Sequence, residues 1–156
     1  MSVNVFSAVR LLDAKLLAAQ VVVHSDEKGE EQRLDYSFSY EKSDERIDEE
    51  RPAYRCQLQV GMITSEEDGP EAEPSVSVSV TYGGFIDAPV SDKMSEEAFE
   101  RVIRDNAFSL LYGIIRGKIQ DLTALTPQGA VVLPGVVPAT LLDALEEKAN
   151  GGQEDK

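Results

Sequence analysis

The sequence predicts an α+β domain in which a four-stranded antiparallel sheet is covered on one face by a long helix and a short C-terminal helix. Two observations support this fold class. Apolar and polar residues alternate with the two-residue period of half-buried strands in the first half of the chain, most regularly from Ser75 to Phe85. Apolar residues then recur at helical spacing after Ser95. We therefore expect one domain over residues 1–149, followed by a flexible acidic tail at 150–156.

The first two predicted strands are separated by a polar connection at 25–32. The first lies within Val3–His24, where the β-branched run Val21–Val23 favours extended backbone. Apolar doublets interrupt its alternation, so we expect a bulged or broken strand. In the second strand four residues share one face, because successive side chains of a strand point to opposite sides: Leu34, Tyr36, Phe38 and Tyr40.

The third and fourth strands follow the same pattern. A charged connection at 42–52 leads to alternation from Tyr54 to Met62, and an acidic connection at 65–74 leads to the most regular strand. Its two faces are Val76, Val78, Val80 and Tyr82 against Ser75, Ser77, Ser79 and Thr81. Such alternation is typical of an antiparallel sheet with one buried and one wet face. We expect Gly83-Gly84 to end this strand.

A long helix is predicted to start at Ser95, a suitable N-cap, with Glu96 and Glu97 favourable near the positive end of the helix dipole. Its apolar arc is broad, which indicates contact with the sheet and with a second surface such as another subunit. Glycines 113 and 117 either permit close helix approach on that surface or are merely tolerated. A Pro/Gly-rich ordered loop at 125–138 and a short amphipathic helix complete the domain.

The charge of the chain limits its partners. A formal net charge of −14 argues against binding to nucleic-acid backbones or anionic membranes, which both require Lys and Arg. Neutral, basic or unfolded polypeptide partners are expected instead. The N-terminal residues mix charged and apolar side chains unlike a signal peptide, and no stretch reaches the roughly 18 apolar residues of a membrane span. A cytoplasmic location is therefore expected.

The residues offer little for catalysis. There is one histidine and one cysteine, and His24 beside Ser25 and Asp26 is uninformative because catalytic triads are assembled by the fold. The acidic runs lack the spacing of a calcium loop, and Gly83-Gly84 lacks the lysine and following helix of a phosphate-binding loop. Cys56 lies in a strand pattern that favours a buried thiol. We expect no catalytic residues, metal or cofactor, and hence no enzyme.

Three segments, together with the order of the elements, resemble the SecB family of export chaperones. YGGFIDAP at 82–89 resembles the family's Gly-Gly strand, and RDNAFSLLYGIIRGKIQDLT at 104–123 resembles its Asn-containing helix with an Arg followed by a small residue. LTPQGAVVLPGVVPATLLDALEEKA at 125–149 resembles its Pro-rich loop and closing helix. The resemblance implies a dimer-of-dimers homotetramer that holds unfolded polypeptides in apolar grooves without ATP or a cofactor.

The resemblance also implies binding residues. The connection at 25–32 lacks the aromatic residues that line part of the family's groove, so strand and loop residues would have to supply more of it. The candidate client-binding residues are Tyr36, Phe38, Tyr54, Phe85, Ile86, Val132, Leu133 and Leu141. The candidate residues of an oligomer interface are Leu110, Gly113, Ile114 and Gly117.

Departures from the family bear on the clients. Export members carry acidic and leucine residues on the wet sheet face to dock the SecA motor, whereas the corresponding residues here are Ser77 and Ser79, with Lys15 and Ala19 on the first strand. Docking to SecA is therefore disfavoured, and the clients are either preproteins for export or, as in another branch of the family, a cognate antitoxin.

Two other classes of function stay open. The net charge and the acidic loops favour an acidic interaction module that binds one folded basic partner, and such binding would be strongly salt-sensitive. A small-molecule-binding or enzymatic domain would require a pocket with converging polar groups, which the sequence does not reveal.

Overall fold

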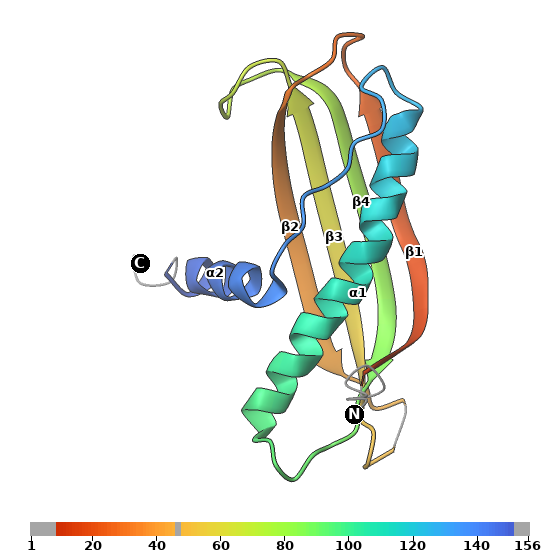
Figure 1. The fold of residues 1–156 in the computed structure, drawn as a ribbon, viewed down its shortest axis with the longest axis vertical. Helices are drawn as coiled ribbons and strands as arrows, with labels where there is room; N and C mark the ends of the chain where they lie inside the picture. Colours follow the sequence, from red (N-terminus) through yellow and green to blue (C-terminus); the bar gives the residue numbers. More distant parts are fainter. Residues whose placement is uncertain (1–8, 46–47, 152–156) are drawn as a thin grey trace, which may run out of the picture.

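The structure is a computed structural model that describes residues 9–45 and 48–151, and within them the chain forms four strands and two helices (Figure 1). The strands are β1 (Arg10–Val23), β2 (Glu31–Lys42), β3 (Ala53–Ser65) and β4 (Pro74–Asp87). The helices are α1 (Glu96–Ala124) and α2 (Pro138–Gly151). All strands pair antiparallel in the order β1-β4-β3-β2, so β1 and β2 are the edges of the sheet. The predicted fold class is confirmed.

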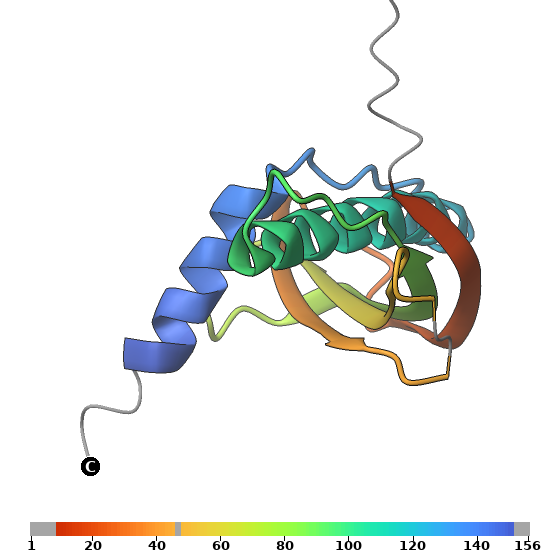
Figure 2. The ribbon, with the colours of Figure 1, turned by 90° about the horizontal axis from the view of Figure 1, so that it is seen from below.

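One face of the sheet is covered and the other is open. In Figures 1 and 2, α1 crosses one face diagonally and α2 projects beyond the β2 edge, while no helix of the described chain lies on the opposite face. The alternating residues of the central strands pack against every third or fourth residue of α1. The largest fully buried side chains are Phe108, Leu58, Met62, Ile86, Ile103, Leu111, Ile115, Ile119, Leu133, Val60, Val76 and Val80.

The predicted bulges in the first strand are confirmed. The pairing of β1 with β4 shifts between Leu11 and Asp13 and again between Leu16 and Ala18. The second shift places Ala19 opposite the buried Val80, on the covered face, so the expectation that Ala19 belongs to the wet face is wrong. The part of the predicted strand before residue 9 lies outside the described residues.

The expectation that Gly83-Gly84 ends the fourth strand is also wrong. β4 continues to Asp87, and both glycines pair with β1 on one side and β3 on the other. A Cβ atom on Gly84 would lie 2.5 Å from the carbonyl oxygen of Asp13. A Cβ atom on Gly83 would lie 2.9 Å from a methyl carbon of Leu17. The glycines therefore let the bulged strand approach closely and do not form a corner.

The N-terminus of α1 is as predicted. Ser95 is the N-cap, and its hydroxyl oxygen accepts a hydrogen bond from the backbone N–H of Ala98 at 3.1 Å. Glu96 and Glu97 occupy the first turn. Neither helix in the described residues is long and apolar enough to span a membrane.

The segment from 125 to 137, here called the strap, connects α1 to α2 across the covered face (Figure 1). Tyr112 donates a hydrogen bond to the carbonyl oxygen of Pro134 at 2.6 Å. The side-chain amide of Gln128 donates to and accepts from the backbone of Gly29, at 2.7 and 2.9 Å. These bonds order the strap. α2 then extends two residues beyond the predicted domain end at 149, and residues 152–156 lie outside the described chain.

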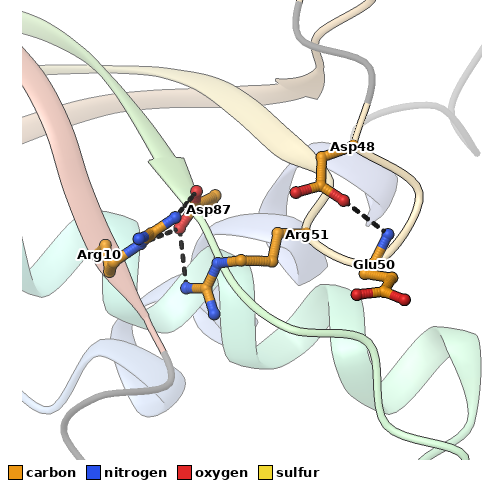
Figure 3. A network of polar contacts seen from close by, with 5 residues as sticks. All are labelled: Arg10, Asp48, Glu50, Arg51 and Asp87. Atoms are coloured by element: carbon orange, nitrogen blue, oxygen red, sulfur yellow. Dashed lines mark hydrogen bonds and ion pairs between the residues drawn. The ribbon is translucent and has the colours of Figure 1, made fainter.

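A cluster of charges holds the start of β1 to the end of β4 (Figure 3). The carboxylate of Asp87, which is 5% exposed, accepts hydrogen bonds from Arg10 at 2.6 and 2.9 Å and from Arg51 at 2.9 Å. The hydrogen bond from Arg10 is the main cause that lowers the pKa of Asp87 to about 2; burial opposes this shift. Asp87 is therefore ionised at neutral pH and ties β1 to the β2–β3 connection.

Candidate functional site

A hollow of about 370 Å³ lies between the edge strand β2 and the helix α2, and we call it the β2–α2 groove. It is lined by Tyr36, Ser37, Phe38 and Tyr40 of β2, by Arg104 of α1, and by Leu142, Leu145, Glu146 and Ala149 of α2. Ligand sites typically combine aromatic and apolar walls with a few placed polar groups. The groove has that composition.

The β2 side of the groove is a row of three rings. Tyr36, Phe38 and Tyr40 share one side of the strand because they are two residues apart. That side is the covered face, where the three rings pack against the core and are each half-buried. Phe38 packs edge-on against Phe108 of α1 with ring centres 5.6 Å apart, and lies 5.9 Å from Tyr40. Tyr36 lies 6.1 Å from Tyr112. The rings are fixed on their inner sides and keep part of their surface accessible to a ligand.

The position of α2 depends on a buried arginine. The guanidinium of Arg104, only 4% exposed, contacts Asp105 at 2.9 Å and, on α2, Asp143 at 3.0 Å and Glu146 at 3.1 Å. Burial acts to lower the pKa of Arg104, but hydrogen bonds to the three carboxylates outweigh it and raise the pKa. Leu142 adds the one buried apolar contact of α2. Leu141 and Leu145 also pack partly buried against the core, so the outer wall of the groove is held by charge together with three leucines.

The strap adds exposed apolar side chains on the same face. Val131 and Leu133 are buried, whereas Val132 between them is 59% exposed. Val137, where the strap meets α2, is 66% exposed. Over residues 131–133 the strap therefore turns alternate side chains towards the core and towards solvent.

Only part of the predicted client-binding set comes together. Tyr36 and Phe38 line the groove, while Val132 on the strap is exposed and Leu141 at the start of α2 is half-buried. The structure places Tyr54, Ile86 and Leu133 in the core.

Phe85 lies on the opposite, open face, where the Arg55 guanidinium sits 5.5 Å from its ring centre. Adjacent strand residues such as Phe85 and Ile86 cannot share a face, so they cannot both belong to one surface site.

Several groove residues were not predicted as site residues: Tyr40, Arg104, Leu142, Leu145 and Glu146. Tyr40 belongs to the same alternating row as Tyr36 and Phe38, so the period of β2 was sufficient to include it. No local signal marks Arg104, because its α2 partners lie 39 and 42 residues further along the chain.

The open face of the sheet is polar at its centre. Gln59 donates a hydrogen bond to the Ser79 hydroxyl at 3.0 Å, and a ring nitrogen of His24 lies 3.0 Å from the Ser77 hydroxyl.

Burial raises the pKa of Cys56 to about 11, so its thiol stays protonated at neutral pH. In the described part of the chain, no group of three or more His, Cys, Asp or Glu is arranged to hold a metal ion.

No protein-family model and no curated protein sequence matches this chain. Solved structures do. The SecB-like chaperone Rv1957 of Mycobacterium tuberculosis, in complex with a ChAD peptide from the Rv1956 HigA1 antitoxin, matches with a TM-score of 0.52 and 18% identity. The match covers 83% of this chain and 91% of that chain. This chain has a SecB-like fold.

A second solved structure has the same fold. It is a protein of unknown function from Streptococcus agalactiae, which matches with a TM-score of 0.54 and 12% identity over 81% of this chain and 97% of that chain. At such low identities the similarity establishes the fold alone. Proteins of one fold can differ in function, which depends on their binding sites.

Proposed function

We propose that this protein is an ATP-independent chaperone that holds unfolded or aggregation-prone polypeptides in the β2–α2 groove. One observation carries the proposal: half-exposed rings on an edge strand face an apolar side of α2. Burial of apolar surface stabilises a complex by roughly 25 cal/mol per Å², and this driving force needs neither ATP nor a catalytic group. The similar Mycobacterium tuberculosis chaperone, solved with an antitoxin peptide, supports the same role here.

The proposed binding residues follow from the geometry. Tyr36, Phe38 and Tyr40 form one wall and Leu142 and Leu145 the other. Two predicted residues, the exposed Val132 of the strap and the half-buried Leu141 of α2, are further candidates outside the lining of the groove. The buried residues Tyr54, Ile86 and Leu133 support the groove from the core and do not contact a client in this conformation.

The clients are preproteins for export or a cognate antitoxin. The serines at positions 77 and 79 of the open face are uncharged, which supports a chaperone that does not dock to SecA. A holdase in the cytoplasm needs only the groove to act on either client.

We further propose a homotetramer that uses the outer side of α1, at Leu110, Gly113, Ile114 and Gly117. Leu110 is exposed, and a Cβ atom on Gly113 or Gly117 would meet no atom within 4 Å. The segment from Asn106 to Gln120 contains no acidic residue and two basic ones, Arg116 and Lys118, in a chain with 29 Asp and Glu. Depletion of Asp and Glu is typical of protein interfaces.

The test is suppression of aggregation of a chemically denatured protein without ATP, combined with mass measurement by light scattering. We expect suppression near equimolar ratio and a mass four times the 17.1 kDa of one chain. A monomer without suppression contradicts the proposal. Binding to a single folded basic protein that disappears in 0.5 M salt would favour an acidic interaction module, because salt screens charge and leaves apolar burial intact.

A further inference from the structure

The outer side of β2 is an open strand edge. β2 ends the sheet, and the described chain pairs no further strand with it. All 12 residues from Glu31 to Lys42 pair with β3 without a shift of register. A regular edge of this kind presents a row of unpaired backbone N–H and C=O groups that another chain can pair with.

The unpaired backbone groups belong to the aromatic residues of the groove. The N–H of Ser43 donates to the carbonyl oxygen of Ala53 at 2.8 Å, so Ser43 hydrogen-bonds to β3. In an antiparallel pair, such residues alternate with residues whose N–H and C=O point away from the partner strand. Since the register is continuous, Tyr36, Phe38 and Tyr40 direct their N–H and C=O groups to the open edge.

The groove includes this edge. It touches three consecutive residues of β2, from Tyr36 to Phe38, although their side chains alternate between the two faces of the sheet. One hollow can contact all three of these residues only if it extends to the backbone at the edge of the strand. Leu142 and Leu145 of α2 lie on the opposite side of the groove from this edge.

The centre of β2 carries none of the features that normally block an edge. Proteins protect edges with bulges, prolines or charged side chains. The five residues from Tyr36 to Tyr40 read YSFSY and contain neither proline nor charge, and their pairing has no bulge.

The acidic residues around the groove indicate the charge of the polypeptide that it would bind. The carboxylate of Glu146 lines the groove and that of Asp143 lies next to the lining residue Leu142 on α2; both are more than half exposed and are paired with Arg104. Glu41 follows the aromatic row on β2. An acidic rim complements a polypeptide with basic residues at its ends and none that are acidic.

We propose that the groove binds its client by strand addition: an extended segment with an apolar residue at every second position pairs with the free edge of β2 as a fifth strand. Its apolar side chains lie between Phe38 and the leucines of α2, and its intervening polar side chains lie beside Ser37 and Ser39. This proposal rests on the proposed function and specifies its substrate class and mode of binding.

The test uses a synthetic peptide of alternating leucine and threonine with lysine at both ends, bound to the full chain and followed by fluorescence anisotropy. Single N-methyl groups are placed on each backbone nitrogen in turn. Methylation of the nitrogens that face β2 removes a hydrogen bond and blocks approach, so binding should weaken about tenfold or more at every second position. The intervening nitrogens face solvent, and their methylation should change binding by less than about twofold.

Hydrogen exchange supplies matched internal controls. On peptide binding, exchange of the Phe38 and Tyr40 amides should slow at least about tenfold, whereas the Ser37 and Ser39 amides, already bonded to β3, should change little. Binding without a two-residue period, and with unchanged exchange at Phe38, overturns strand addition but leaves a groove that uses side chains alone. If neither this peptide nor a denatured protein binds, the proposed function itself fails.

Discussion

The two edges of the sheet are built differently. β1 is bulged at two places and exposes aliphatic side chains, among them Leu17, which is 55% exposed. β2 is regular, carries aromatic rings and is bordered by α2. Bulges twist an edge away from partners, whereas a regular edge is ready to pair. The two edges of the sheet therefore differ in how readily they can pair with another strand.

The interactions that hold the two edges in place differ as well. β1 is anchored by Arg10, which shares the carboxylate of Asp87 on β4 with Arg51 of the β2–β3 connection, and by its close approach to Gly84. At the β2 edge, the wall of the groove is held by Arg104 through carboxylates that are more than half exposed. We therefore expect changes near β1 to affect folding stability and changes near β2 to affect mainly α2 and client binding.

The largest effect is expected for Gly84→Ala. The added Cβ would lie 2.5 Å from a backbone oxygen of β1, so the strands must separate, at a cost of about 2–3 kcal/mol in the free energy of unfolding. Urea denaturation measures this cost. Gly135→Ala is the matched control: its Cβ meets no atom within 4 Å, and stability should stay within about 0.5 kcal/mol of the wild type. Equal effects of the two substitutions would contradict the account.

Asp87→Asn should cost about 2 kcal/mol at neutral pH, because it weakens the hydrogen bonds from Arg10 and Arg51 to a buried carboxylate. The pKa of Asp87 is lowered to about 2 in the folded state and is about 3.9 in the unfolded chain. Its contribution is therefore present above pH 4 and is lost as the pH falls towards 2.

The pH dependence gives a second check of Asp87. Urea denaturation of the wild type at pH 4 and at pH 2 should show a loss of stability that Asp87→Asn shows only in part. Parallel pH profiles of the two proteins would contradict the assignment.

Arg104→Met should free α2 while the sheet stays folded, with a loss of about 1–2 kcal/mol. Three carboxylates lose their shared cation, and α2 keeps only the buried Leu142 and the half-buried Leu141 and Leu145 as apolar contacts with the core. Hydrogen exchange should accelerate across 138–151 and stay slow in β3 and β4. Arg101→Met is the control, because Arg101 is exposed and pairs only within α1. Unchanged exchange in α2 would show that the ion pairs do not hold it.

The smallest effects are expected for two substitutions that compare the covered face of the sheet with the open face. Phe38→Ala should weaken client binding about tenfold, equivalent to about 1.4 kcal/mol, as measured by anisotropy with a denatured protein. Phe85→Ala should leave binding unchanged and reduce stability by only about 0.5–1 kcal/mol, the typical contribution of its contact with Arg55. The opposite ranking would move the binding site to the open face.

The sequence was sufficient where one strand or one turn decides the structure. Alternation placed Tyr36 and Phe38 on one face, and Ser95 with its acidic neighbours marked the start of α1. It was insufficient where distant segments meet. The conformation at Gly84 depends on the carbonyl of Asp13, and the bulge at Leu17 reverses the side to which Ala19 points. The second wall of the groove depends on Arg104 meeting carboxylates from another helix.

The most direct test of a client site at the β2 edge is site-specific photo-crosslinking to a denatured protein. A photoreactive phenylalanine derivative replaces Phe38 in one variant and Leu17, on the β1 edge, in another. Leu17 is 55% exposed, so the control residue is readily accessible. We predict that the probe at position 38 forms adducts with the client and the probe at position 17 forms few. Equal labelling, or labelling from position 17 alone, would contradict the account.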